Sequence, residues 1–183
     1  DVTGITSKAA VEAVRALFSA YNICAEVKWV NDLILNRKKI GGILVEAGKM
    51  TSGGRIPRAV VGVGINVNQR TFPEEIKEKA TSLFLETGFP WEVDSLASAL
   101  VDRLNFLREN LASPEEASAY LAEYRGICTT VGSEISFVRE GTVQCCTAVG
   151  VDDSYGLIVR YPDSSSEILR SGEVSVRGIA GYV

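Results

Sequence analysis

The sequence has 183 residues, of which 46% are hydrophobic and 23% charged, a composition typical of a globular protein with enough apolar material for a core. Its net charge of −4 argues against a general nucleic-acid coat, and the absence of histidine excludes a Ser-His-Asp triad, a Cys-His dyad and histidine-ligated metals. No run approaches the roughly 20 apolar residues that cross a bilayer, and no signal peptide opens the chain, so we expect a cytoplasmic protein without membrane contact.

The first part of the sequence alternates helical and extended patterns. Apolar residues recur at spacings of three and four over 7–21 and again over 93–110, which indicates amphipathic helices. Short apolar or β-prone runs separate them. The predicted elements are, in chain order, helix 7–21 capped by Ser7, strands 25–29, 33–35, 40–46 and 59–67, a mixed loop and short helix over 69–90, helix 93–110, and a helix from Pro114 to about Tyr124.

The composition changes after Gly126. From Thr129 onward, short strands and turns alternate, a pattern that predicts a small barrel of about five strands. We therefore predict an α+β chain with two domains. Residues 1–127 form a mixed sheet with flanking helices, and residues 128–183 form the barrel.

Four cysteines are present without a C-x-x-C pair, so neither a disulfide nor a zinc framework is predicted. Adjacent Cys145 and Cys146 should point to opposite faces of a strand. We expect buried free thiols, as in a reducing cytosol. The sequence begins with Asp1 and its only methionine is Met50, which predicts a processed chain or part of a longer polypeptide.

The stretch from Lys28 to Glu46, KWVNDLILNRKKIGGILVE, is the richest in candidate chemistry. Lys28 and Lys39 bracket a predicted hairpin, and lysine ammonium groups suit phosphate oxygens. Asn31 could hydrogen-bond a base or ribose, and Asp32 could hold Mg²⁺ beside a nucleotide. A polar hairpin with solvated charges is the alternative, and spacing alone does not exclude it.

Glycines interrupt two otherwise apolar strands. Gly41 and Gly42 lie inside the first, where glycine usually marks a bulge or a close approach by a backbone or a ligand. In the second, VVGVGIN, strand alternation places Gly62, Gly64 and Asn66 on one face and branched apolar side chains on the other. A flat small ligand could lie on the bare face, and close packing against a helix is the alternative. The spacing matches neither the dinucleotide fingerprint nor a Walker A loop.

These segments carry a family resemblance. KWVNDLILNRKKIGGILVE closely resembles the K-W-P-N-D…K…G-G-I-L-x-E signature of biotin protein ligases, with Val30 in place of the usual proline. VVGVGINVN resembles the following G-x-G-I-N-x-N strand, and ATSL over 80–83 resembles the A-T-S-L segment. The closing stretch, with its G-E-V-S-V-R sequence, resembles the C-terminal SH3-like module. The motifs occur in family order over nearly the whole chain.

The resemblance implies an enzyme that joins biotin to ATP with Mg²⁺, giving biotinyl-5′-adenylate and pyrophosphate. The adenylate then acylates a lysine of the carrier domain of a biotin-dependent carboxylase. Carried over by position, Lys39 is the main catalytic residue, Lys28 supports phosphate binding, and Asp32 contacts nucleotide and Mg²⁺. The positions assigned to ligand binding are Trp29, Asn31, Gly41, Gly42, Ile43, Gly62, Gly64 and Asn66. In the barrel, Glu173 and Arg177 could reach ATP or the carrier domain, or could form a structural ion pair.

The family also has an earlier half, with a biotin-gripping strand and a glycine–arginine loop, and neither occurs in this sequence. Three arrangements follow from the resemblance: a piece of a complete ligase, which we favour, a split ligase completed by a second chain, or a non-catalytic binding module. A lipoate ligase is a further alternative, but the GGILVE and G-E-V-S-x-R runs fit biotin ligases better. No DNA-binding winged helix is present, so a repressor role is not expected. A homodimer through strand edges is compatible with the predicted fold.

Overall fold

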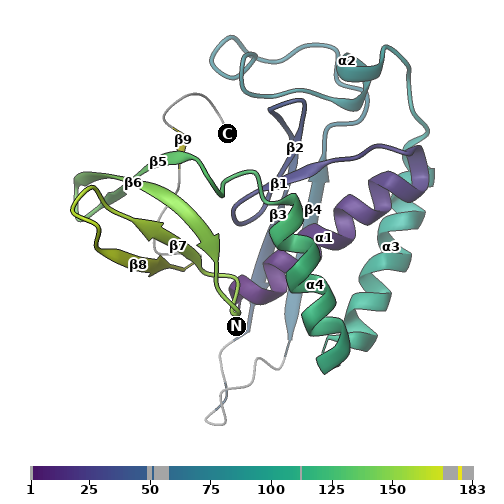
Figure 1. The fold of residues 1–183 in the computed structure, drawn as a ribbon. Helices are drawn as coiled ribbons and strands as arrows, with labels where there is room; N and C mark the ends of the chain where they lie inside the picture. The colour runs from purple at the N-terminus through teal and green to yellow at the C-terminus, as the bar shows by residue number, and fades with distance from the viewer. Residues whose placement is uncertain (1, 49–50, 52–57, 112, 171–176, 179–183) are drawn as a thin grey trace.

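The computed structural model describes residues 2–48, 51, 58–111, 113–170 and 177–178 and contains two antiparallel sheets, with helices against the first (Figure 1). The described elements are α1 (Val2–Tyr21), β1 (Glu26–Lys28), β2 (Asp32–Leu35), β3 (Lys38–Ala47), β4 (Ala59–Ile65), α2 (Leu83–Thr87), α3 (Val93–Asn110), α4 (Pro114–Ile127), β5 (Glu134–Arg139), β6 (Thr142–Val151), β7 (Leu157–Arg160), β8 (Ser166–Leu169) and β9 (Arg177–Gly178). The predicted α+β class is confirmed.

The first sheet has the strand order β1-β2-β3-β4, and each neighbouring pair is antiparallel. The prediction of a mixed sheet was therefore wrong for the described strands, where parallel pairing is limited to two isolated bridges, Val27–Cys128 and Lys39–Ala80. The reason is the tight connection between β2 and β3. Asn36 and Arg37 both have positive φ, 48° and 66°, as in the two-residue turns that join antiparallel strands.

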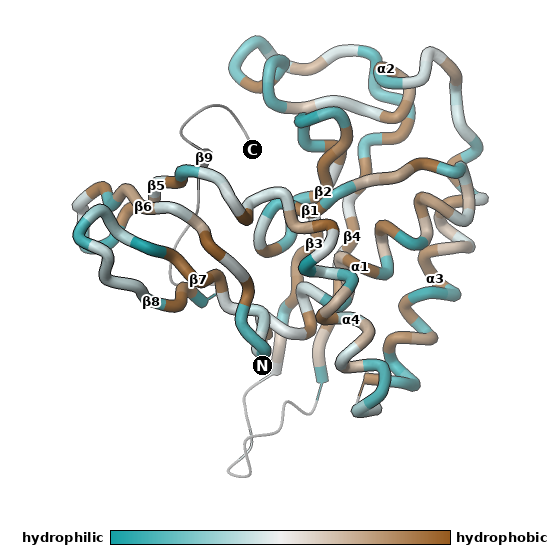
Figure 2. The backbone as a smooth tube through the Cα atoms, viewed as in Figure 1, coloured by the Kyte–Doolittle hydropathy of each residue, from teal (hydrophilic) through white to brown (hydrophobic). Residues whose placement is uncertain are grey.

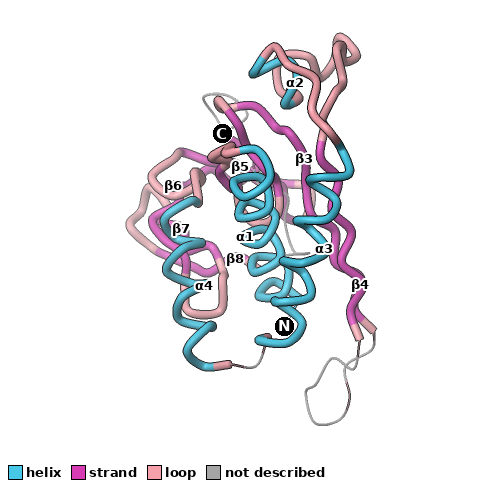
Figure 3. The backbone as a smooth tube through the Cα atoms, turned by 90° about the vertical axis from the view of Figure 1, so that its right-hand side faces the viewer, coloured by secondary structure: helices cyan, strands magenta, loops and turns pink. Residues whose placement is uncertain are grey.

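Helices α1, α3 and α4 lie on one side of the first sheet, and the views in Figures 1 and 3 place no described helix on the other side of β3 and β4. Helix α1 is the central one and is buried along much of its length. It begins at Val2, earlier than the predicted residue 7. Thr3 and Thr6 are buried, and Ser7, the predicted cap, is fully buried inside the helix. Tertiary packing of these buried residues thus helps to order the first turns of α1.

The second sheet has the order β8-β7-β6-β5-β9 and is antiparallel throughout. Hydrophobic residues run along β6 and β7 (Figure 2). The buried side chains of this sheet include Ile135 and Phe137 of β5, Leu157 and Val159 of β7, and Leu169 of β8. Closure of this sheet into a barrel, and the domain boundary after residue 127, stay predictions. Among the described residues, no helix is both long and apolar enough to span a membrane.

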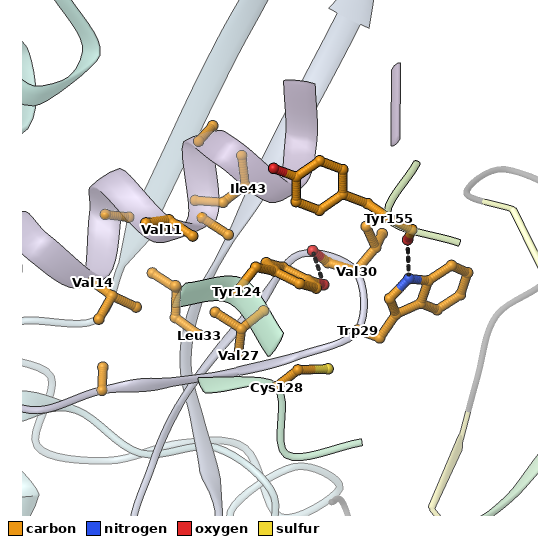
Figure 4. Packing of buried hydrophobic residues seen from close by; sticks show 14 of the residues in the cluster. Val11, Val14, Val27, Trp29, Val30, Leu33, Ile43, Tyr124, Cys128 and Tyr155 are labelled. Atoms are coloured by element: carbon orange, nitrogen blue, oxygen red, sulfur yellow. Dashed lines mark hydrogen bonds between the residues drawn. The ribbon is translucent and has the colours of Figure 1, made fainter. Parts of the chain in front are cut away.

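The turn after β1 joins the two sheets (Figure 4). The Trp29 backbone N–H donates to Thr130 Oγ1 at 2.8 Å, and its indole Nε1–H donates to the Tyr155 carbonyl at 2.9 Å. The Tyr124 hydroxyl donates to the Val30 carbonyl at 3.1 Å. The peptide bond between Trp29 and Val30 is cis. These contacts are buried, so the turn that carries the K-W-V-N-D motif is fixed from behind by residues far along the chain.

The four cysteines are free, as predicted, but only Cys128 and Cys146 are buried. Cys24 and Cys145 are exposed, so the expectation that all the thiols are buried was wrong for these two. The opposite orientations of Cys145 and Cys146 follow from strand alternation along β6. Burial raises the pKa of Cys146 to about 11 and also raises the pKa of Cys128.

Candidate functional site

Four of the candidate residues form one row across the first sheet. Lys28 of β1 lies opposite Asp32 of β2, Asp32 opposite Gly42 of β3, and Gly42 opposite Gly64 of β4. Residues directly opposite one another in antiparallel strands extend from the same face. We call Lys28, Asp32, Gly42 and Gly64 the transverse row. The sheet register thus brings together residues that lie up to 36 positions apart.

Lys39 joins this row through its side chain. Its Nζ forms a hydrogen-bonded ion pair with Asp32 Oδ1, and both side chains keep partial exposure. A β-bulge between Leu33 and Ile34 shifts the β2–β3 register beside it. Lys28, by contrast, is buried, with 6% exposure. The row and Lys39 together bring two cationic side chains and one carboxylate into a small area of sheet.

The missing side chains of the glycines keep this face open. A Cβ at Gly42 would lie 3.3 Å from Asp32 Oδ1 and 3.5 Å from Lys39 Cε, so glycine leaves room for the ion pair. A Cβ at Gly62 or Gly64 would meet no atom closer than 3.7 Å or 4.0 Å. The predicted alternation along β4 is confirmed, since both glycines are exposed while Val63 and Ile65 are half-buried.

Apolar side chains continue the open face away from the row. Leu44 lies opposite Gly62, and Val60 lies opposite Glu46. Leu44 is 64% exposed and Val60 is 62% exposed. Lys39 and Asp32 at one end, and bare backbone with Leu44 before the exposed Glu46 at the other, suit a ligand that has an anionic part and an apolar part.

Other predicted ligand positions are engaged within the fold. Asn31 is tied to β3, because its Nδ2 donates to the Ile43 carbonyl at 2.6 Å and its carbonyl accepts from the Ile43 N–H at 2.9 Å. Ile43 and Trp29 are buried in the core, with exposures of 2% and 6%. Gly41 is buried as well, and a Cβ there would collide with the Gly64 carbonyl oxygen. Ligand contact by these four residues stays a prediction.

Asn66 follows β4 and links it to the A-T-S-L segment. Its N–H donates to the Ile40 carbonyl at 2.7 Å, and its Nδ2 donates to the Thr81 carbonyl at 3.1 Å. The next part of this segment is ordered by Ser82, which caps α2 by accepting from the Leu85 N–H at 3.1 Å. Asn66 is half-buried at the end of the strand that carries Gly62 and Gly64.

The tyrosine side chains that pack behind the turn at Trp29 and Val30 are uncharged. Burial raises the pKa of Tyr124 well above its usual value, so its hydroxyl stays protonated and donates to Val30. The Tyr124 and Tyr155 rings meet edge to face with centroids 5.5 Å apart. Sequence reasoning missed this support, together with Thr130, because no local motif announces a side chain that acts on a turn 94 to 126 residues away.

A metal site built by the protein alone is not found among the described residues, which contain no group of three or more potential acidic, cysteine or histidine ligands. Asp32 is the single carboxylate of the transverse row. One carboxylate fits a Mg²⁺ ion that arrives with nucleotide phosphates, because such ions take most of their ligands from phosphate and water. Glu173 lies outside the described residues. Of Arg177, in β9, the structure describes the backbone, which pairs with Ser136 of β5.

Comparisons with known proteins bear on this geometry. A model of the biotin/lipoate A/B protein ligase family matches residues 2–66. Bifunctional ligase/repressor BirA of Bacillus spizizenii is 41% identical over 86 residues, which are 46% of this chain and 26% of that protein. BirA of Salmonella typhimurium is 28% identical over 151 residues, 82% of this chain and 46% of that protein.

A solved structure, biotin protein ligase from Aquifex aeolicus in complex with biotin and ATP, superposes with a TM-score of 0.82 at 25% identity. The likeness covers 97% of this chain and 72% of that one. The chain belongs to the biotin protein ligase family. The chain spans less than half the length of these two BirA proteins. Within the family, the chain corresponds to part of the catalytic domain together with the C-terminal region.

Proposed function

We propose that this chain is part of a biotin protein ligase that makes biotinyl-5′-adenylate from biotin and ATP and transfers the biotinyl group to a lysine of a biotin carboxyl carrier domain. The observation that carries the proposal is the transverse row with Lys39 paired to Asp32 on an open sheet face. The likeness to a ligase structure that holds biotin and ATP supports it.

The reaction suits the groups on this face. A biotin carboxylate oxygen attacks the α-phosphorus of ATP, a new P–O bond forms, and the bond to the pyrophosphate oxygen breaks. Negative charge builds up between the two reactants, and the Lys39 ammonium, which is paired with Asp32 on this face, would stabilise that charge. Lys28 adds a second cationic side chain in the same row. No histidine is needed for this step.

The transfer step uses the same face. The amine of the carrier lysine attacks the acyl carbon, AMP leaves, and the amine loses a proton. Asp32 is the carboxylate that could assist that amine, once it shares Lys39 with the anionic ligand. Mg²⁺ bound with ATP would neutralise phosphate charge, and Asp32 is the residue of the row that would hold it.

The remaining assignments belong to the same proposal. Asn31, Gly41, Gly42 and Ile43 border the adenylate, and Gly62, Gly64 and Asn66 contact its nucleotide side. The C-terminal sheet closes as an SH3-like barrel, and its Glu173 and Arg177 act on ATP or the carrier domain. The carrier domain is the protein partner, and a homodimer through strand edges is an additional expectation.

The test is biotin-dependent ATP–pyrophosphate exchange in the full-length protein, with Lys39→Ala and the neighbouring Lys38→Ala as matched control. Lys39→Ala should lower exchange by at least about 100-fold, as loss of a charge-stabilising group does, while circular dichroism stays unchanged. Lys38→Ala should retain most activity. Near-normal exchange in a folded Lys39→Ala protein would show that the assignment of Lys39 is wrong.

The substrate is tested in the same assay. The matched family model covers biotin and lipoate ligases together, so exchange is measured with biotin and with lipoate at equal concentrations. Exchange that depends on biotin supports the proposal. Exchange that depends on lipoate instead would assign the chain to lipoate activation, and no exchange with either would favour a binding module.

A further inference from the structure

The carboxylate of Glu86 in α2 connects two segments that flank Lys39. Its Oε1 accepts from Thr81 Oγ1 at 2.5 Å, and its Oε2 accepts from Asn36 Nδ2 at 2.6 Å. Asn36 belongs to the β2–β3 turn, three residues before Lys39, and Thr81 belongs to the A-T-S-L segment. Glu86 and Asn36 are 50 positions apart, so this link exists only in the folded protein.

The A-T-S-L segment in turn holds the backbone of Lys39. The Lys39 N–H donates to the Lys79 carbonyl at 2.8 Å, and the Lys39 carbonyl accepts from the Thr81 N–H at 2.8 Å. These bonds form the isolated bridge between Lys39 and Ala80. Both backbone polar groups of Lys39 therefore depend on where residues 79–81 lie.

Asn36 also links the β2–β3 turn to α2. It adopts positive φ, 48°, in the hairpin turn, and it is exposed. A hydrogen bond from its side chain to Glu86 fixes the turn relative to α2. Through Thr81, which is buried with 2% exposure, the same carboxylate fixes the segment that grips Lys39. One side chain thus controls the start of β3 from two directions.

We propose that Glu86 is a positioning residue for Lys39, one that holds the lysine ammonium at the transverse row without contacting the reactants. The inference rests on the proposed function for the role of Lys39. Glu86 acts here through hydrogen-bond geometry. Glutamine at this position keeps both links, because its amide oxygen accepts from Asn36 and its amide nitrogen donates to the Thr81 hydroxyl.

The kinetic experiment compares Glu86→Ala, Glu86→Gln and the control Glu78→Ala in the full-length protein. Glu78 is exposed and lies two residues before the A-T-S-L segment. Biotin-dependent ATP–pyrophosphate exchange should show a kcat about tenfold lower in Glu86→Ala, with KM for biotin within about twofold, because the reacting groups are misplaced rather than lost. Glu86→Gln should keep kcat within about threefold of the unmodified protein, and Glu78→Ala should be unaffected. A Glu86→Gln protein as impaired as Glu86→Ala would overturn the proposal.

A double-mutant cycle separates positioning from general damage. In the Lys39→Ala background, Glu86→Ala should have no further effect on residual exchange, since a residue that acts through Lys39 has nothing left to position. A further tenfold loss there, which would make the two effects additive, contradicts the inference.

A third measurement needs no substrate. Amide hydrogen exchange of Lys39 and Thr81, read by NMR, should be at least about tenfold faster in Glu86→Ala and near normal in Glu86→Gln. Unchanged exchange in Glu86→Ala would refute the positioning role. If the unmodified protein forms no adenylate, the proposed function fails, and the amide data still decide whether Glu86 holds the Lys39 backbone.

Discussion

The proposed function gives single side chains at the open face distinct roles, and Asn66 is one example. It extends from the strand that carries Gly62 and Gly64, and its amide bonds the Thr81 carbonyl. We assign it to the nucleotide side of the ligand. The charged end of the face, by contrast, is formed by Lys28, Lys39 and Asp32. Loss of the Asn66 amide should therefore separate the two substrates.

We predict that Asn66→Ala weakens ATP binding by about five- to tenfold, the effect of one neutral hydrogen bond, and changes biotin binding by less than about twofold. Titration calorimetry with biotin and with a non-hydrolysable ATP analogue measures both affinities. Asn68→Ala is the control, because Asn68 is exposed and its amide bonds the Trp91 backbone. Equal losses for both ligands would remove Asn66 from the nucleotide side.

At the residue scale, motif and alternation identified Lys28, Asp32, Lys39, Gly42 and Gly64, and the structure brings these five together. The sequence could not predict the support of Lys39 by Glu86, or of Trp29 by Thr130. Both depend on tertiary contacts between distant segments, and the local sequence of one segment does not indicate which residue of the other it contacts.

At the scale of helices and strands, the sequence predicted bounds well where apolar residues are regularly spaced, and poorly where tertiary packing decides where an element begins. Helix α3 has the predicted bounds, 93–110, because its apolar spacing is regular. The start of α1 was missed because buried small polar residues begin it. The hairpin between β2 and β3 was predicted, but its antiparallel continuation into β4 was not. Most of the chain between the predicted strands 40–46 and 59–67 lies outside the described residues.

Strand β3 gives a prediction at the element scale, since its two adjacent glycines face opposite sides. A Cβ at Gly41 would collide with the Gly64 carbonyl oxygen and lie 3.1 Å from Ile65 Cα, both backbone atoms that cannot move cheaply. Gly41→Ala should lower the free energy of unfolding by about 1–3 kcal/mol, as overpacking does. Gly62→Ala, whose added Cβ would make only ordinary van der Waals contacts with Leu44 at 3.7 and 4.0 Å, should change it by less than about 0.5 kcal/mol. Urea denaturation measures both, and equal losses would contradict the close approach at Gly41.

The whole molecule depends on the contacts that join its two sheets. The Thr129 N–H donates to the Val27 carbonyl at 2.9 Å, and Thr130 accepts from the Trp29 N–H. Tyr155 and Tyr124 contact the same turn. The domain boundary after residue 127 stays a prediction, and no sequence pattern indicated that residues beyond it support the K-W-V-N-D turn.

We predict that Thr130→Val lowers the free energy of unfolding by about 1–3 kcal/mol, because a buried Trp29 N–H loses its acceptor. The same change at neighbouring Thr129, which is partly exposed and whose hydroxyl lies 3.3 Å from the Val27 carbonyl, should cost less than about 1 kcal/mol. Urea unfolding followed by tryptophan fluorescence provides the values. A Thr130→Val protein as stable as Thr129→Val would mean that this junction contributes little.

The transverse row has a consequence for how the protein folds. It takes one residue from each of four strands, so it exists only when three separate strand pairings have been completed in register. A slip of one residue in any pairing turns that strand's contribution to the opposite face. Partly folded chains therefore lack the complete row. A ligand that needs the whole row binds and stabilises only the fully paired sheet, and does not bind folding intermediates.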